Sequence, residues 1–167
     1  MDILHKKIRI KLPEVLPKAI PDEDLQQILA TITTVRDRAL ILLLLHTGMR
    51  IGELLKVKMA DIILPERKIL LPLGEKNLHG RVVYYSSAAE QALNKWLAIR
   101  KPDSDYLFYG YRGGELSYVV AWTIMKKAVQ KAGLEQRGYS LHSLRHYVES
   151  GIMGRKTAKI PFIGCKF

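Results

Sequence analysis

The segment ALILLLLHTGMRIGE, residues 39–53, sets the architecture that we expect for the whole chain. Its first seven residues place apolar side chains on every side of a helix, which is typical of a central buried helix rather than a surface helix. We predict that this helix runs from about Val35 to His46 and ends at Thr47-Gly48, because glycine supplies the left-handed turn that closes a helix. A short helix from Ile51 to about Lys56 follows, so Arg50 stands where a new helix begins.

Apolar periodicity and turn residues predict further elements on both sides of this central helix. The first predicted helix starts within Ile20–Asp24, where Pro21 suits the first turn and the acids suit the positive end of the helix dipole, and it runs to about Thr31. The others are Ser87–Arg100, Ser117–Ala132 and a helix that begins near Leu141. The predicted strands are Ile62–Leu64, Lys68–Leu73 and Arg81–Ser86, joined by turns that contain Pro65-Glu66 and Gly74–Gly80. Strands joined in this way form a small antiparallel sheet, so we expect a mostly helical chain with one such sheet.

Composition indicates a single domain with a polyanionic partner. The chain has 167 residues, of which 48% are hydrophobic, and this is enough apolar material for one sizeable core. The net charge is +11 and the pI is about 9.8. Because a basic surface attracts phosphate backbones, nucleic acid is the first candidate partner and an anionic membrane surface is the second.

Membrane and metal classes are disfavoured. The longest apolar run, Ala39–Leu45, is too short to cross a bilayer, and the basic N-terminus has no apolar core behind it. We therefore expect a soluble, cytoplasmic protein. The single cysteine, Cys165, has no partner for a disulfide and no companion ligands at zinc spacing, so we expect no metal and no cofactor.

Four residues far apart in the chain lie in local settings that suit phosphate binding. They are Arg50 in residues 47–53, Lys76 in Gly74-Glu75-Lys76 before a strand, and His142 and Arg145 in His-Ser-Leu-Arg. Three cations and an imidazole in one cleft would neutralise the non-bridging oxygens of a phosphodiester and protonate its leaving group. The alternative is that each charged side chain simply faces solvent.

In this order the segments resemble the catalytic domain of the tyrosine recombinases, the phage integrase family of DNA breaking and rejoining enzymes. The resemblance covers roughly Leu16 to Tyr147: two helices, Thr-Gly-Met-Arg with glutamate three residues later, a three-stranded sheet with a hairpin lysine, two helices, and His-x-x-Arg-His. It implies a mixed α/β fold, mostly α-helical, with a small three-stranded antiparallel sheet at one edge. It also implies double-stranded DNA as the partner.

The resemblance implies roles for matching residues. Arg50 would be the first phosphate-binding arginine, oriented by Glu53. Lys76, in the hairpin, would protonate the leaving 5′ oxygen. Arg145 would be the second phosphate clamp, and His142 would assist proton transfer.

Three further basic residues and one histidine complete the predicted site. His146 is expected to support the site by packing rather than by reacting. Arg81 in the strand and Arg155 and Lys156 in the C-terminal tail are expected to contact DNA. Catalysis would need no metal, because the cations take its place.

The chain departs from the family pattern at its C-terminal end. Family members carry a further His or Trp and then a nucleophilic tyrosine, whereas no tyrosine follows Tyr147 here, so we assign no nucleophile. Tyr147, Tyr84 and Tyr85 are expected to pack. We divide the chain into a basic arm or linker remnant (1–16), an integrase-like catalytic domain (17–150) and a divergent basic tail (151–167). The pattern suggests a recombinase shortened at both ends, either by truncation or frameshift or as an expressed fragment.

Three functions remain open from the sequence. The first is the DNA-binding catalytic domain of a recombinase that cannot complete cleavage on its own. It would be a monomer off DNA, and full-length recombinase protomers would be possible partners on DNA. The second is a non-catalytic nucleic-acid-binding module, and the third is a structural fold with incidental charge. A nuclease, in which water attacks the clamped phosphate, is a weaker alternative.

Overall fold

The structure, a computed structural model, describes residues 20–71 and 80–149. In these ranges lie helices α1 (Asp22–Thr31), α2 (Val35–Thr47), α3 (Ile51–Leu55), α4 (Ser87–Ile99), α5 (Tyr118–Lys131) and α6 (Leu141–Glu149). The strands are β1 (Ile62–Ile63), β2 (Lys68–Leu71) and β3 (Arg81–Tyr84). Short 3₁₀ turns lie at Met59–Asp61, Leu64–Glu66 and Glu135–Arg137. The predicted fold class, mostly helical with a small three-stranded antiparallel sheet, is confirmed.

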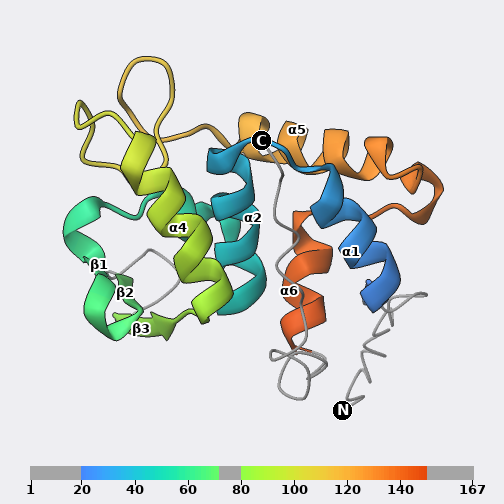
Figure 1. The fold of residues 1–167 in the computed structure, drawn as a ribbon, viewed down its shortest axis with the longest axis horizontal. Helices are drawn as coiled ribbons and strands as arrows, with labels where there is room; N and C mark the ends of the chain where they lie inside the picture. The colour runs from blue at the N-terminus through green and yellow to red at the C-terminus, as the bar shows by residue number, and fades with distance from the viewer. Residues whose placement is uncertain (1–19, 72–79, 150–167) are drawn as a thin grey trace, which may run out of the picture.

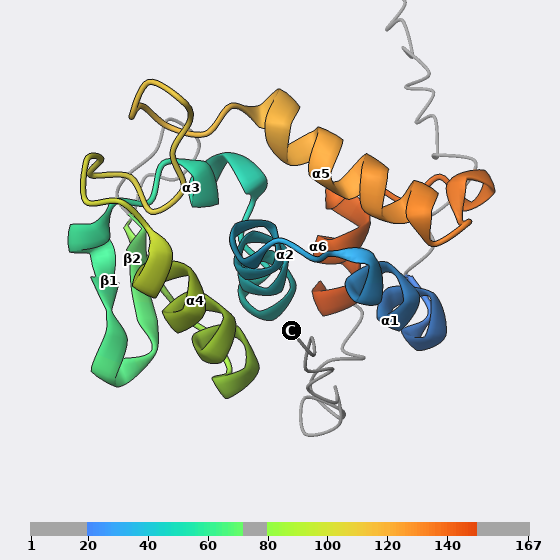
Figure 2. The same ribbon diagram turned by 45° about the horizontal axis from the view of Figure 1, so that its top comes forward.

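Helix α2 is the centre of the fold, as the leucine run predicts. Every side chain from Ala39 to Leu45 is buried, with at most 5% of its surface exposed. Helix α4 packs on one side of α2 and α6 on the other, and Figure 2 shows α2 nearly end-on between them. Truncating a fully buried leucine here, such as Leu43 to alanine, is expected to destabilise the fold by about 2–5 kcal/mol.

The remaining helices form a layer around this centre. Helix α1 packs against α5, and α5 also contacts α3. Figure 1 shows α1, α5 and α6 on one side of α2 and the sheet on the other side, beside α4. Serine side chains start two of these helices, because Ser86 and Ser117 each accept a hydrogen bond from a backbone N–H three residues ahead.

The sheet has the strand order β1-β2-β3 and is antiparallel throughout. Only one of its faces is covered: Ile69, Leu71 and Val83 are buried, while Leu70 and Val82 are exposed. This alternation is typical of an antiparallel sheet with one face on the core.

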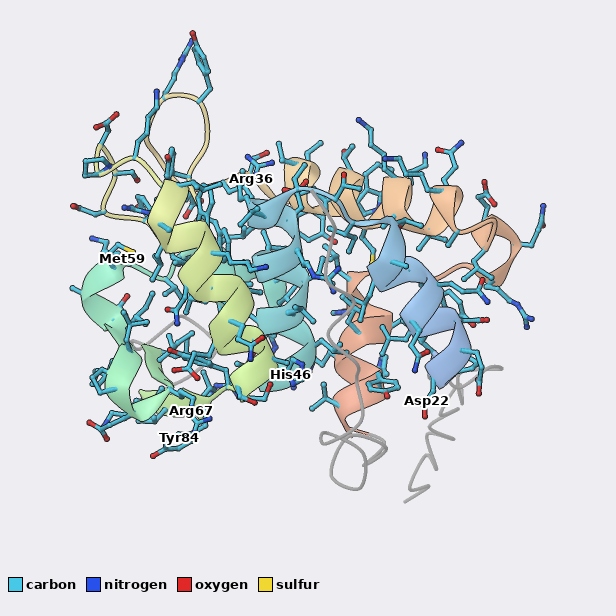
Figure 3. The ribbon with its side chains drawn as sticks, in the orientation of Figure 1. Asp22, Arg36, His46, Met59, Arg67 and Tyr84 are labelled. Atoms are coloured by element: carbon cyan, nitrogen blue, oxygen red, sulfur yellow. The ribbon has the colours of Figure 1, made fainter. Side chains whose placement is uncertain are left out.

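Three details of the sheet differ from the sequence prediction. Strand β3 ends at Tyr84, two residues before the predicted end at Ser86. Strand β1 ends at Ile63, because Leu64–Glu66 form a 3₁₀ turn that closes with Arg67 in the left-handed conformation, φ 50°. The expectation that Tyr84 packs is wrong: 65% of its surface is exposed, whereas Tyr85 is 5% exposed. Figure 3 shows Tyr84 at the lower edge of the sheet. The two neighbours point to opposite faces of a strand, and only one face meets the core.

Candidate active site

The turn between α2 and α3 places Arg50 on the surface. Gly48 takes the left-handed conformation, φ 62°, and its N–H donates to the carbonyl of Leu44 at 3.0 Å. The Thr47 hydroxyl donates to the carbonyl of Leu43 at 2.6 Å and accepts from the N–H of Met49 at 3.3 Å. Met49 turns inward and is 1% exposed. The next residue, Arg50, therefore faces outward at the N-cap of α3.

Glu53 joins two arginines that lie far apart in the chain. Its Oε2 atom accepts from the backbone N–H of Arg50 at 2.7 Å and from Nη2 of Arg81 at 2.7 Å. Its Oε1 atom accepts from Nη1 of Arg50 at 3.4 Å. The Glu53 side chain is only 17% exposed, and the Arg50 side chain is 50% exposed. The short bonds of the carboxylate thus go to the backbone and to Arg81, while the Arg50 guanidinium makes one long contact with Glu53 and faces solvent.

Helix α6 carries the His-x-x-Arg pair to the same region. A Cβ atom added at Gly48 would lie 3.1 Å from Cγ1 of Val148, so α6 touches the turn that precedes Arg50. Arg145 lies one helical turn before Val148, about 4.5 Å along the helix axis. Arg145 is half-buried, with its Nη1 atom out of contact with solvent.

The two histidines of α6 differ in exposure. His142 is exposed and His146 is half-buried, and their rings meet edge to face with centroids 6.2 Å apart. The supporting role of His146 stays a prediction. No group of three or more His, Cys, Asp or Glu side chains within residues 20–71 and 80–149 could hold a metal ion.

The predicted site residues are placed as follows. Glu53 brings Arg50 and Arg81 together, and the close approach of Val148 to Gly48 brings the helix of His142 and Arg145 to the same turn. Lys76, Arg155 and Lys156 lie outside the described residues, as do the predicted arm and tail. Their roles remain predictions.

Tyr147 packs as expected and is held by an acid. It is 3% exposed, and its hydroxyl donates to Oδ1 of Asp22 at 2.8 Å. Burial, together with the Asp22 carboxylate, raises the pKa of Tyr147 to about 12. A phenol held in this way is a poor nucleophile at neutral pH, because its phenolate form is strongly disfavoured.

Sequence reasoning missed the partners of Glu53 and of Tyr147. Arg81 was expected to contact DNA directly, but its guanidinium pairs with a carboxylate 28 residues away. Asp22 was expected only to face the positive end of a helix dipole. Both pairings join residues distant in sequence, so neither local spacing nor periodicity could have revealed them.

The comparisons with known proteins agree with this arrangement. A model of the phage integrase family matches residues 18–163, and this range includes every described residue. The chain belongs to the phage integrase family. The match continues past Tyr147, where the sequence resemblance was expected to end, up to residue 163.

The relatives that the chain matches include tyrosine recombinases, and the matching solved structures include recombinases and integrases. The tyrosine recombinase XerD of Corynebacterium glutamicum is 39% identical over 137 residues, which cover 79% of this chain and 43% of XerD. The crystal structure of the XerA recombinase matches with a TM-score of 0.74 and 24% identity over 87% of this chain and 53% of XerA, a likeness of fold.

A third match is the XerH site-specific recombinase bound to its difH substrate in a pre-cleavage complex. Its TM-score is 0.68 and its identity 25%, over 85% of this chain and 44% of XerH. The integrase-family chain thus spans about half the length of the relatives that it matches. None of the helices in the described ranges combines the length and the apolarity that a bilayer crossing requires.

Proposed function

We propose that this chain is the DNA-binding catalytic domain of a site-specific recombinase, which holds a phosphodiester between Arg50 and Arg145. The observation that carries the proposal is the packing of α6 against the turn before Arg50, through Val148 and Gly48. This contact brings the His-x-x-Arg helix next to the first arginine. XerH, a relative in fold, is a site-specific recombinase bound to DNA.

The two arginines are suited to the charge that strand transfer creates. Attack on a phosphodiester builds negative charge on the equatorial oxygens, and guanidinium groups stay ionised and reach two oxygens at once. Arg50 offers a half-exposed fork whose backbone is fixed by Glu53. Arg145 offers a half-buried fork, and the lower local dielectric strengthens its interaction with an anion.

His142 is the proposed proton-transfer group, because it is exposed on the helix that carries Arg145. Lys76 is the proposed acid for the leaving oxygen, and it lies five residues before Arg81 in the sequence. We do not propose Tyr147 as the nucleophile, and its burial and its bond to Asp22 support this choice.

The proposed partner is double-stranded DNA, with full-length recombinase protomers as further partners on the same site. The net charge of +11 favours a polyanion. Affinity for duplex DNA is therefore expected to fall steeply with salt, with a slope of log affinity against log salt of about −0.9 for each phosphate neutralised. Off DNA, a monomer is expected.

A double-mutant cycle tests the shared phosphate. Arg50→Ala and Arg145→Ala are each expected to weaken duplex binding by about tenfold or more, and the double variant by clearly less than the product, because both side chains hold one phosphate. Arg36→Ala is the matched control. Arg36 pairs with Asp37 and lies about 18 Å from Gly48 along the α2 axis, at the far end of the helix from His46 (Figure 3).

The cycle also separates the alternatives. Strictly additive losses from Arg50→Ala and Arg145→Ala would favour a binding module that contacts separate phosphates. Duplex binding that does not change between low and high salt would remove DNA as the partner and favour a structural fold. Conversion of supercoiled plasmid to nicked circles without added metal would indicate a nuclease.

A further inference from the structure

Two tyrosines bracket the ends of α6, and both bond to the first turn of α1. Tyr139 lies two residues before α6 begins, and its hydroxyl donates to Oδ2 of Asp24 at 2.6 Å. Tyr147 lies near the end of α6, and its hydroxyl donates to Oδ1 of Asp22 at 2.8 Å. These bonds span 115 and 125 residues of sequence. One helical turn of α1 is therefore bonded near both ends of α6.

Both bonds are partly buried, and each has one buried member. Asp24 is 9% exposed and Tyr147 is 3% exposed. Nε of Arg137 lies 3.9 Å from the Asp24 carboxylate and places a positive charge beside it. Asp22 and Asp24 also stand at the N-terminal end of α1, where the helix dipole favours an ionised carboxylate. Short O–H···O⁻ bonds of this kind are about twice as strong as neutral hydrogen bonds.

The anchors determine which way α6 faces. At about 100° per residue, Tyr147 and Arg145 project about 200° apart, on opposite sides of the helix. Holding Tyr147 against α1 therefore turns Arg145 away from α1. His142 and Arg145 both lie between Tyr139 and Tyr147 in the sequence, so rotation of α6 about its axis would draw the Tyr147 hydroxyl away from Asp22. Figure 3 shows Asp22 on α1 beside α6.

We infer that Asp22 and Asp24 are positioning residues, which fix the axial rotation of α6 and so aim Arg145 and His142 at the phosphate. This inference rests on the proposed function for the phosphate, whereas the anchoring of α6 rests on the contacts alone. Neither acid touches substrate in this account. Their effect on DNA passes entirely through Tyr139, Tyr147 and the helix between them.

Hydrogen exchange of the α6 amides tests the anchoring without DNA. The double variant Tyr139→Phe/Tyr147→Phe removes both donors and keeps both rings in place. Its α6 amides are expected to exchange at least about tenfold faster than those of the wild type. The amides of α4 are expected to keep their exchange rates, because neither of the two bonds involves α4. The same result is expected for Asp22→Ala/Asp24→Ala. Unchanged exchange in the phenylalanine pair would overturn the inference.

Glu23→Ala is the matched control. Glu23 lies between the two acids in the same turn and is exposed, so its removal takes away a carboxylate at the same end of the helix dipole without removing an anchor. It is expected to leave α6 exchange unchanged. If Glu23→Ala raises the exchange rates of the α6 amides as much as Asp22→Ala/Asp24→Ala does, the charge at the helix end alone explains the effect and the positioning role is refuted.

Duplex binding tests the positioning role. In the wild-type chain, Arg145→Ala is expected to reduce the affinity for duplex DNA by about tenfold. In the Tyr139→Phe/Tyr147→Phe variant, the same substitution is expected to change the affinity by less than twofold, because Arg145 no longer points at the phosphate. A full tenfold loss in both backgrounds would refute the positioning role even if exchange is faster. If the wild-type chain binds no duplex, the proposed function fails, and the exchange experiment still decides whether α1 anchors α6.

Discussion

Removing the carboxylate of Glu53 is expected to destabilise the fold by about 2 kcal/mol. The bond from the Arg50 N–H to Oε2, at 2.7 Å, caps α3, and a lost cap costs about 1 kcal/mol. The Arg81 pair at 2.7 Å involves a side chain that is 40% exposed, so solvent screening limits it to about 1 kcal/mol or less. The 3.4 Å contact with the half-exposed Arg50 guanidinium adds little.

This estimate can be checked by urea unfolding, which gives the free energy, and by thermal unfolding, which gives Tm, both followed by circular dichroism. Glu53→Ala is expected to lower Tm by about 4–8 °C, since 1 kcal/mol corresponds to about 2–4 °C in a domain of this size. The control is Glu90→Ala, because Glu90 lies in the first turn of α4 and its ion pair with Arg67 is 4.0 Å long, with both side chains at least a third exposed. Equal effects of the two substitutions, within about 0.5 kcal/mol, would refute the assignment of Glu53 as the link between Arg50 and Arg81.

Three further outcomes follow from single residues. Gly48→Ala is expected to destabilise the fold by about 1–3 kcal/mol in urea unfolding, because φ is 62° and the new Cβ meets Val148 at 3.1 Å. Gly52→Ala, whose new Cβ has no atom within 4 Å, is expected to stabilise the fold by about 0.5–1 kcal/mol. Equal effects of the two substitutions would contradict this. Burial lowers the pKa of His46 to about 4, so the unfolded chain takes up the proton first as pH falls. Stability should therefore drop by up to about 3 kcal/mol between pH 6.5 and 4, and His46→Leu should flatten the profile there. The pKa of Tyr147 is raised to about 12, so its contribution is present below pH 10 and is lost as pH rises from about 10 to 12; a Tyr147→Phe profile as steep as that of the wild type would contradict this.

Much of the fold could be predicted because its signals are local. The leucine run before Gly48 predicts a buried helix that ends in a left-handed glycine, and both features are present. Ser86 and Ser117 cap helices close to the predicted starts. These signals depend on residues within one or two helical turns of each other, so a single sequence contains all the information that they need.

The site could be predicted only in part, because its contacts are long-range. The sequence indicates that Arg50 begins a helix and that Glu53 follows one turn later. It does not indicate that Arg81 is the second partner of Glu53, since the strand pattern gives the face on which Arg81 lies but not the residue that its side chain contacts. Likewise Asp24 looks like an exposed acid at a helix start, but it is 9% exposed, Tyr139 donates to it and Arg137 lies beside it. Such pairs are decided by tertiary packing.

The arrangement around Glu53 explains how an acid can stand beside Arg50, the proposed phosphate-binding arginine, without neutralising it. The carboxylate uses its 2.7 Å bonds on the Arg50 backbone and on Arg81, and it touches the Arg50 guanidinium only at 3.4 Å. The bond to the Arg50 N–H fixes the backbone position of Arg50, and Arg81 balances the charge of the carboxylate. An arriving phosphate therefore has to displace only one long, half-exposed contact. Glu53 and the phosphate meet the Arg50 guanidinium in the same solvent-screened setting, where an exposed ion pair is worth about 0–1 kcal/mol, so exchanging one for the other costs little.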